Sequence, residues 1–189
     1  INDVPVYGSS GVDVRSDASN DIERTLSVVL SSGRNKVQVS AVNADGAESI
    51  RATFEVFYDG SQDRKPDLYV VAVGVSDYAG TDFDLNYAAK DATDLARVLS
   101  DNNERFANVH VVPVTDAAAT REGILAARTR LEASKVDDHV VFFLAGHGLL
   151  DDELNYYFAT SDIDFDNPGE RGLGYAELEG ILDGIPARN

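Results

Sequence analysis

The sequence predicts an α/β domain with parallel strands flanked by helices, preceded by a small all-β segment. Strand-type alternation and turn signals fill the first 58 residues. After a polar stretch containing Gly and Pro, the pattern changes to apolar runs separated by amphipathic helical segments. Strands separated by helices of this length are typical of βαβ units, whose strands lie parallel in one sheet. We place the all-β segment at residues 1–59, a linker at 60–66 and the α/β domain at 67–189.

The first segment contains several short strand signals separated by Gly-containing turns. Alternate residues between Val37 and Ala41 are apolar, as a strand with one exposed face requires. The run from Asn43 to Gly46 is typical of a hairpin turn. Strands at this spacing indicate a β-sandwich, although too few are present to cover a complete core. The expected strands are residues 4–6, 12–14, 24–29, 36–42 and 50–57.

The second segment is organised around three continuous apolar runs, which are typical of strands buried on both faces of a parallel sheet. These runs are residues 68–75, 109–114 and 140–145. Residues 85–99 carry an apolar stripe at helical spacing, and Thr120 is suited to cap a second helix. A short strand at 156–159 and a helix at 175–182 complete the expected elements.

The composition excludes several classes of function. The net charge is −17, with 33 acidic and 16 basic residues, which argues against nucleic acid or an anionic membrane as a partner. No apolar run approaches the roughly 20 residues that span a bilayer. Residues 137–189 hold 12 acidic residues against two arginines and could attract a basic substrate, or could be a solvated acidic surface. With no Cys, the chain contains no disulfide, thiolate metal site or thiol nucleophile.

The most informative residue is His147, which lies between Gly146 and Gly148 at the end of the third apolar run. The glycines allow a sharp turn and leave space around the imidazole. A histidine at this point would lie at the carboxyl edge of the sheet, where open α/β folds bind ligands. The alternative is a histidine that only ends the strand.

Three segments, in this order and spacing, resemble the caspase-like peptidases, specifically the metacaspase and paracaspase branch and its bacterial relatives. They are residues 67–78, 85–95 and 141–148, similar to the first strand, the first helix and the catalytic-histidine loop of that fold. The resemblance covers residues 67–189. Residues 1–59 are similar to immunoglobulin-like modules that precede such domains in some large bacterial proteins.

The resemblance implies an endopeptidase with a Cys–His dyad, in which His147 supplies the acid–base chemistry. In such families the Cys follows the His by roughly 50 residues, on the next strand of the sheet. Here 42 residues follow His147, and none is Cys. We therefore expect the nucleophile in a segment or second chain outside these 189 residues, and no peptidase activity from this chain alone. A truncated chain, a proteolytic product and a noncatalytic protein-interaction module remain as alternatives.

Two further roles follow from the resemblance. Asp91 aligns with the acid that lines the specificity pocket in metacaspases and paracaspases, where a buried carboxylate would pair with Arg or Lys before the cleaved bond. Without the resemblance, Asp91 is an acidic residue in the first half of a helix, where a carboxylate interacts favourably with the helix dipole. Gly148 resembles the residue whose backbone N–H holds the oxyanion. Its alternative role is that of a turn glycine.

Alternating carboxylates in Asp162, Asp164 and Asp166 could ligate calcium, which many metacaspases need. However, the neighbouring Asp pair of the family is absent near Tyr175, and there is no EF-hand spacing. We therefore expect no metal and no other cofactor. The remaining histidines, at positions 110 and 139, lie in or beside strands and are expected to face structure or solvent.

Overall fold

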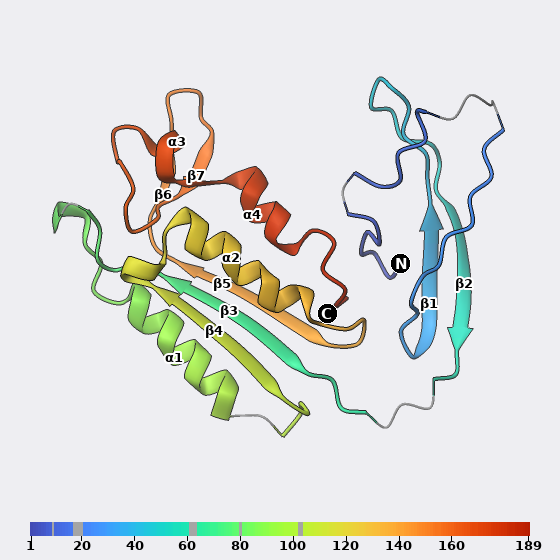
Figure 1. Cartoon of the computed structure of the whole chain (residues 1–189), viewed down its shortest axis with the longest axis horizontal. Helices are drawn as coiled ribbons and strands as arrows, with labels where there is room; N and C mark the ends of the chain where they lie inside the picture. The colour runs from blue at the N-terminus through green and yellow to red at the C-terminus, as the bar shows by residue number, and fades with distance from the viewer. Residues whose placement is uncertain (9, 17–20, 61–63, 80, 102–103) are drawn as a thin grey trace. The chain divides into compact units, whose positions relative to one another are not determined.

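The structure is a computed structural model that describes residues 1–8, 10–16, 21–60, 64–79, 81–101 and 104–189. The chain divides into two compact units, one of Ile1–Asp63 with Arg188 and one of Arg64–Ala187 with Asn189 (Figure 1). Residues 61–63 of the expected linker lie outside the described part of the chain.

The first unit contains an antiparallel pair of strands, β1 (Gly33–Val39) and β2 (Ala52–Tyr58). An isolated bridge between Val42 and Glu48 continues the pairing toward the hairpin turn. The predicted strands at residues 4–6, 12–14 and 24–29 are wrong, because these described residues have no strand structure. β-propensity depends on packing against neighbouring strands more than on the sequence of the segment itself.

The second unit is built on a parallel sheet of order β4-β3-β5, which confirms the predicted three-stranded core. Its strands are β3 (Leu68–Gly74), β4 (Val109–Thr115) and β5 (His139–Ala145). β3 lies at the centre and is buried along its whole length, as its continuous apolar sequence requires.

Alternate residues of β3 face two separate apolar layers. Val71 and Val73 pack with buried residues of α2 (Arg121–Glu132) and α4 (Tyr175–Leu182). Val70 and Ala72 pack with the buried alanines of α1 (Ala88–Asp101). Figure 1 shows α1 on one face of the sheet and α2 with α4 on the other. This arrangement leaves the carboxyl ends of the strands free to carry a site.

The three predicted helices are present, but α1 ends at Asp101 rather than at residue 99, and its start also differs. Thr120 caps α2 by accepting a hydrogen bond from the N–H of Gly123, and α4 has the predicted bounds. α1 begins at Ala88 rather than at residue 85. The preceding residues are drawn back to the end of β3, because Leu85 donates its N–H to Ser76 O.

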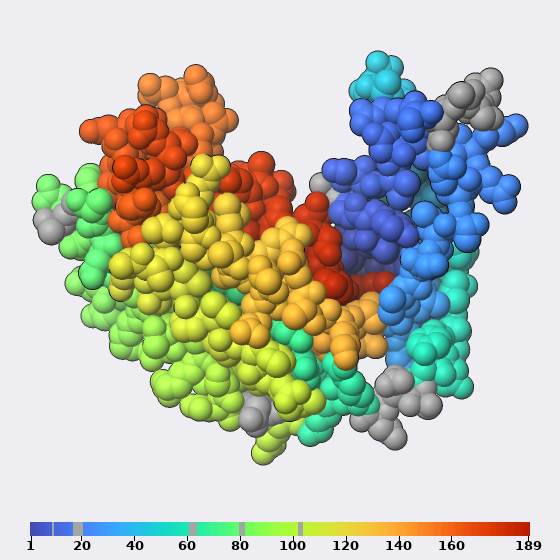
Figure 2. Space-filling view, viewed as in Figure 1, coloured from blue at the N-terminus to red at the C-terminus, as the bar shows by residue number. Residues whose placement is uncertain are grey.

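A smaller antiparallel sheet of order β6-β7-β8 follows β5. Its strands are β6 (Gly148–Leu150), β7 (Tyr156–Phe158) and β8 (Leu173–Gly174), and α3 (Pro168–Arg171) lies between the last two. Only β7 was predicted. Two 3₁₀ turns, Thr81–Phe83 and Asp116–Ala118, follow β3 and β4. In Figure 2 the orange-to-red segment with β6, β7 and α3 projects from one end of the unit.

Within the described residues, no helix is long and apolar enough to cross a membrane.

Candidate active site

His147 lies two residues beyond the end of β5, at the carboxyl edge of the parallel sheet. The pairing of β3 with β5 continues up to this edge, because Val75 donates its N–H to Ala145 O at 2.9 Å. The turn needs Gly146, since a Cβ there would lie 2.9 Å from the hydroxyl of Tyr78. The histidine itself is half-buried.

Two hydrogen bonds fix His147. Its backbone N–H donates to the hydroxyl of Tyr78 at 3.0 Å, and its ring Nε2 lies 2.8 Å from the carbonyl oxygen of Phe83. A carbonyl only accepts hydrogen bonds, so we assign the ring proton to Nε2. Nδ1 of the neutral imidazole then becomes the atom that can accept a proton from another group.

Aromatic side chains surround the imidazole. The centroid of the Tyr78 ring lies 5.2 Å from that of His147, and Phe165 approaches the imidazole edge-on at 6.1 Å. Tyr78 and Phe165 also contact each other edge-on at 5.5 Å. Burial raises the pKa of the Tyr78 hydroxyl, and the hydrogen bond from His147 partly offsets this effect. Tyr78 therefore stays a neutral hydrogen-bonding group at physiological pH.

The loop that presents the Phe83 carbonyl is held by side-chain carboxylates. Asp116 Oδ1 accepts the N–H groups of Ser76 and Asp77, at 2.8 and 3.1 Å. Asp116 has a φ of 44°, a left-handed conformation that is unfavourable for a residue with a side chain. Asp84 Oδ1 accepts the N–H of Tyr78 at 2.9 Å. These bonds fix the position of the loop relative to the sheet edge.

Gly148 begins β6 and lies opposite Phe158 of β7. Ala159 donates its N–H to His147 O, so Gly148 and Phe158 form a pair that exchanges no hydrogen bonds with each other. The N–H of Gly148 is consequently directed away from β7. A Cβ at this position would lie 2.7 Å from the ring of Tyr156, so no larger residue fits without movement.

Asp91 lies in the first turn of α1, near the carboxyl end of β3. Gly74, the last residue of β3, is packed so closely that its Cβ would lie 2.3 Å from Ala88 O. The Asp91 carboxylate is exposed, not buried as expected. The buried stripe of α1 contains Ala88, Ala92 and Ala96, and Asp91 lies outside that stripe.

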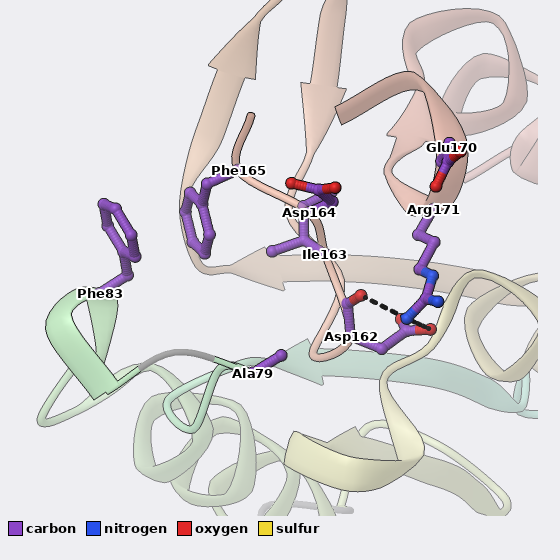
Figure 3. Close-up of a pocket in the computed structure, with 8 residues that line it drawn as sticks. All are labelled: Ala79, Phe83, Asp162, Ile163, Asp164, Phe165, Glu170 and Arg171. Atoms are coloured by element: carbon purple, nitrogen blue, oxygen red, sulfur yellow. Dashed lines mark hydrogen bonds and ion pairs between the residues drawn. The ribbon is translucent and has the colours of Figure 1, made fainter. Parts of the chain in front are cut away.

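A cavity of about 300 Å³ is lined by Phe83 and Phe165, which both contact His147 (Figure 3). It lies between the loop after β3 and the segment after β7, which are joined by a hydrogen bond from Ala79 N–H to Ser161 O at 3.1 Å. Phe83 and Phe165 line it with stacked rings whose centroids are 3.8 Å apart. The cavity and the candidate histidine therefore share two of their neighbouring residues.

The acidic segment beyond β7 has internal partners. Asp164 Oδ1 accepts the N–H of Asp166, and Asp162 Oδ2 lies 3.9 Å from Arg171 Nη1. Among the described residues, no group of three or more His, Cys, Asp or Glu is arranged to hold a metal ion.

The other histidines lie at the amino end of the sheet. His110 stacks on Tyr69 at 4.5 Å and its Nε2 lies 3.2 Å from Asp67 Oδ2. His139 packs edge-on against Phe106, and burial lowers its pKa. Both are separated from His147 by the length of a strand.

The edge of β5 that does not pair with β3 adjoins His147. Val140 at the start of this edge donates its N–H to Asn189 O at 2.8 Å. Ala187 is anchored nearby through a hydrogen bond from its N–H to Ser134 Oγ. Elsewhere along this edge, no strand in the described part of the chain pairs with β5.

Sequence reasoning identified His147 but missed Tyr78, Phe83 and Phe165. Tyr78 carried a weak signal, because it closes the first segment of the resemblance. Phe83 contributes through its backbone carbonyl, for which the residue type gives no indication. Phe165 lies among alternating carboxylates, and this sequence context gives no indication of a place beside His147.

Comparison with protein families matches residues 67–173 to the caspase domain. No curated protein and no solved structure matches the chain. The matched segment covers the parallel sheet, α1, α2, His147 and the smaller sheet as far as the start of β8. The chain belongs to the caspase domain family.

Proposed function

We propose that this chain is the histidine-bearing part of a cysteine endopeptidase that cleaves after Arg or Lys. The observation that carries the proposal is the geometry of His147, whose Nε2 is engaged by the Phe83 carbonyl. This leaves Nδ1 to take the proton of a thiol and later to return it to the leaving amine. The family membership supports a cysteine peptidase.

The nucleophile comes from a strand that pairs with the open edge of β5. If the following segment runs parallel to β5, the hydrogen bond from Val140 N–H to Asn189 O places the residue after Asn189 opposite Val140. A strand that continued this pairing would bring roughly the sixth to eighth residues beyond Asn189 opposite Ala145 to His147. A Cys there would lie beside the imidazole.

Gly148 supplies the oxyanion donor in this proposal. Its N–H is directed away from β7, on the same turn as the histidine. An amide donor fixed in this way can stabilise the negative oxygen that forms when the thiolate attacks a peptide carbonyl. Asp91 supplies the charge that selects Arg or Lys, and the substrate covers its carboxylate on binding.

The experiment uses the complete protein, with the nucleophile strand present, and peptides with Arg or Lys before the cleaved bond. His147→Ala should lower kcat/KM by at least about 100-fold and leave the thermal midpoint nearly unchanged. His139→Gln, at the opposite end of the same strand, is the matched control and should retain activity. The 189-residue chain alone should be inactive.

Activity retained in His147→Ala, or turnover by the purified 189-residue chain, would contradict the dyad. Alkylation by iodoacetamide provides a separate readout, because a Cys paired with His147 should react faster than its counterpart in the His147→Ala protein. A complete protein with no Cys opposite the end of β5 would instead be a noncatalytic interaction module, with the β unit as a second binding surface.

A further inference from the structure

The cavity beside His147 has features that suit one class of substrate side chain. Its lining residues come from the loop after β3 and from the segment after β7, as Figure 3 shows. They are Ala79, Phe83, Asp162, Ile163, Asp164, Phe165, Glu170 and Arg171. Phe83 lines the cavity and its carbonyl contacts the His147 ring, so the cavity and the candidate histidine share this residue.

The cavity is apolar on one side and acidic on the other. The stacked rings of Phe83 and Phe165 form the apolar wall together with Ile163. The other side has three carboxylates, from Asp162, Asp164 and Glu170, against the single guanidinium of Arg171. A long side chain with an apolar stem and a cationic end matches both sides.

One carboxylate oxygen of a residue that lines the cavity lacks a donor. Asp162 Oδ1 is enclosed, and no hydrogen bond from the described residues reaches it. The other carboxylate oxygen is 3.9 Å from Arg171 Nη1, which is beyond hydrogen-bonding distance. Enclosed acceptors in proteins are normally satisfied by a donor. Asp162 Oδ1 is itself closed off, whereas the Asp162 side chain as a whole is 41% exposed, so a cationic group in the cavity would approach this carboxylate from its exposed part.

The cavity and Asp91 belong to opposite faces of the sheet. α1, which bears Asp91, packs on the layer of Val70 and Ala72. Ile163 and Phe165 pack on the other layer. His147 lies at the edge between these layers, so a bound peptide would offer side chains from the two sides of the cleaved bond to the two places.

We propose that this cavity receives the Lys or Arg side chain of the residue immediately after the cleaved bond. The proposal rests on the proposed function, with Asp91 receiving the residue before the bond. The complete enzyme would then prefer a pair of basic residues around the cleaved bond. This preference is additional to the one that Asp91 provides.

Two kinds of substrate separate the two proposals. A peptide with Arg linked directly to a fluorogenic amine has no residue after the cleaved bond and tests only the proposed function. Internally quenched peptides with Lys, norleucine or Glu after the bond test the cavity. The test variant is Asp164→Asn with Glu170→Gln, since both side chains are exposed and their replacement leaves the apolar wall intact. Asp166→Asn, in the same loop but outside the cavity lining, is the matched control.

The double variant should lower kcat/KM for the Lys peptide by about 3- to 10-fold. It should leave kcat/KM unchanged for the norleucine peptide and for the Arg peptide that carries the fluorogenic amine. Equal cleavage of the Lys and Glu peptides by the unmodified enzyme would overturn the cavity proposal. So would an equal loss on all substrates in the double variant.

Binding gives a readout that does not need turnover. The His147→Ala protein should bind a labelled peptide with Lys after the bond more tightly than it binds the norleucine peptide. Adding the double variant to the His147→Ala protein should remove this difference. No difference between these peptides in the His147→Ala protein would overturn the cavity proposal. If the unmodified enzyme did not cleave the Arg peptide that carries the fluorogenic amine, this result would count against the proposed function alone.

Discussion

The backbone N–H of His147 donates a hydrogen bond to the buried hydroxyl of Tyr78 at 3.0 Å, although 69 residues separate them in sequence. This bond ties the turn after β5 to the loop after β3. The same loop presents the Phe83 carbonyl to the ring of His147. The histidine is thus positioned at its backbone and at its ring by one neighbouring loop.

Tyr78→Phe should therefore impair catalysis more than substrate binding. The variant leaves the His147 N–H without its acceptor and frees the turn to shift, and small displacements of a catalytic group lower rates substantially. We expect kcat to fall about 10-fold or more with little change in KM. Steady-state kinetics of the complete enzyme measure this.

Tyr69→Phe is the control for the loss of a buried hydroxyl, because Tyr69 donates to Ala133 O at the far end of the sheet. It should lower stability to a similar extent and leave kcat unchanged. If both variants lowered kcat equally, the Tyr78 hydroxyl would have only a general structural role.

Gly74→Ala should destabilise the fold by about 1–3 kcal/mol or more, because the added Cβ would meet the backbone of α1 at Ala88 and Ala89. Gly180→Ala in α4 is the opposite case, since nothing lies within 4 Å of its added Cβ. It should stabilise the protein by about 0.5–1 kcal/mol through helix propensity. Urea unfolding measures the stability of both variants. Equal unfolding midpoints for Gly74→Ala and Gly180→Ala would mean that α1 does not pack on β3 as closely as described.

Asp138 is the main polar anchor at the amino end of the sheet. Its carboxylate is 1% exposed and accepts hydrogen bonds from the N–H groups of Asp67 and Lys135 and from Arg64 Nη2. Asp138→Ala should lower the free energy of unfolding by about 2–5 kcal/mol, because it orphans these donors.

The neighbouring Asp137 is exposed, and Asp137→Ala should change stability by less than about 0.5 kcal/mol. Arg64→Gln should have an intermediate effect, because the Arg64 side chain is partly solvated and the two backbone donors would keep their acceptor. Chemical denaturation distinguishes the three. A small effect of Asp138→Ala would indicate that water replaces its hydrogen bonds.

The sequence predicted the parallel sheet, α2 and α4 because their periodicity extends over enough residues to be recognised. β6, β8 and α3 are too short to carry a period, so they form through their tertiary neighbours. The start of α1 was misplaced because hydrogen bonds to the distant Ser76 decide it: Ser76 O accepts from Leu85 N–H, and Ser76 Oγ accepts from Ala89 N–H.

The candidate site was predicted in the same uneven way. His147 was recognisable because glycines flank it after a buried strand. Its contacts with Phe83 O and Tyr78 depend on loops that only the folded chain brings together. The first unit was predicted poorly, since alternation alone does not supply the neighbouring strands that stabilise a sheet.

Asp91→Asn should reduce the preference of the complete enzyme for Arg and Lys before the cleaved bond. The carboxylate is exposed in the free chain and is available to an incoming cation. In the complex, the substrate covers the ion pair between its cationic side chain and the Asp91 carboxylate. Loss of this ion pair should lower kcat/KM on Arg peptides by more than about 10-fold, and should affect Arg more than Lys because guanidinium pairs with a carboxylate in bidentate geometry.

Asp94→Asn is the matched control on the same helix, because the Asp94 carboxylate is already paired with Lys90 and Arg97. Replacement of Asp151 or Asp152 tests the general acidic field, whose effect should appear mainly at low salt. The Asp91 effect should persist at high ionic strength, since a pair enclosed by substrate is screened little. If the unmodified enzyme preferred Asp before the bond, or if Asp91→Asn left the preference unchanged, Asp91 would be only a helix-dipole acid. The dyad and the fold would stand without it.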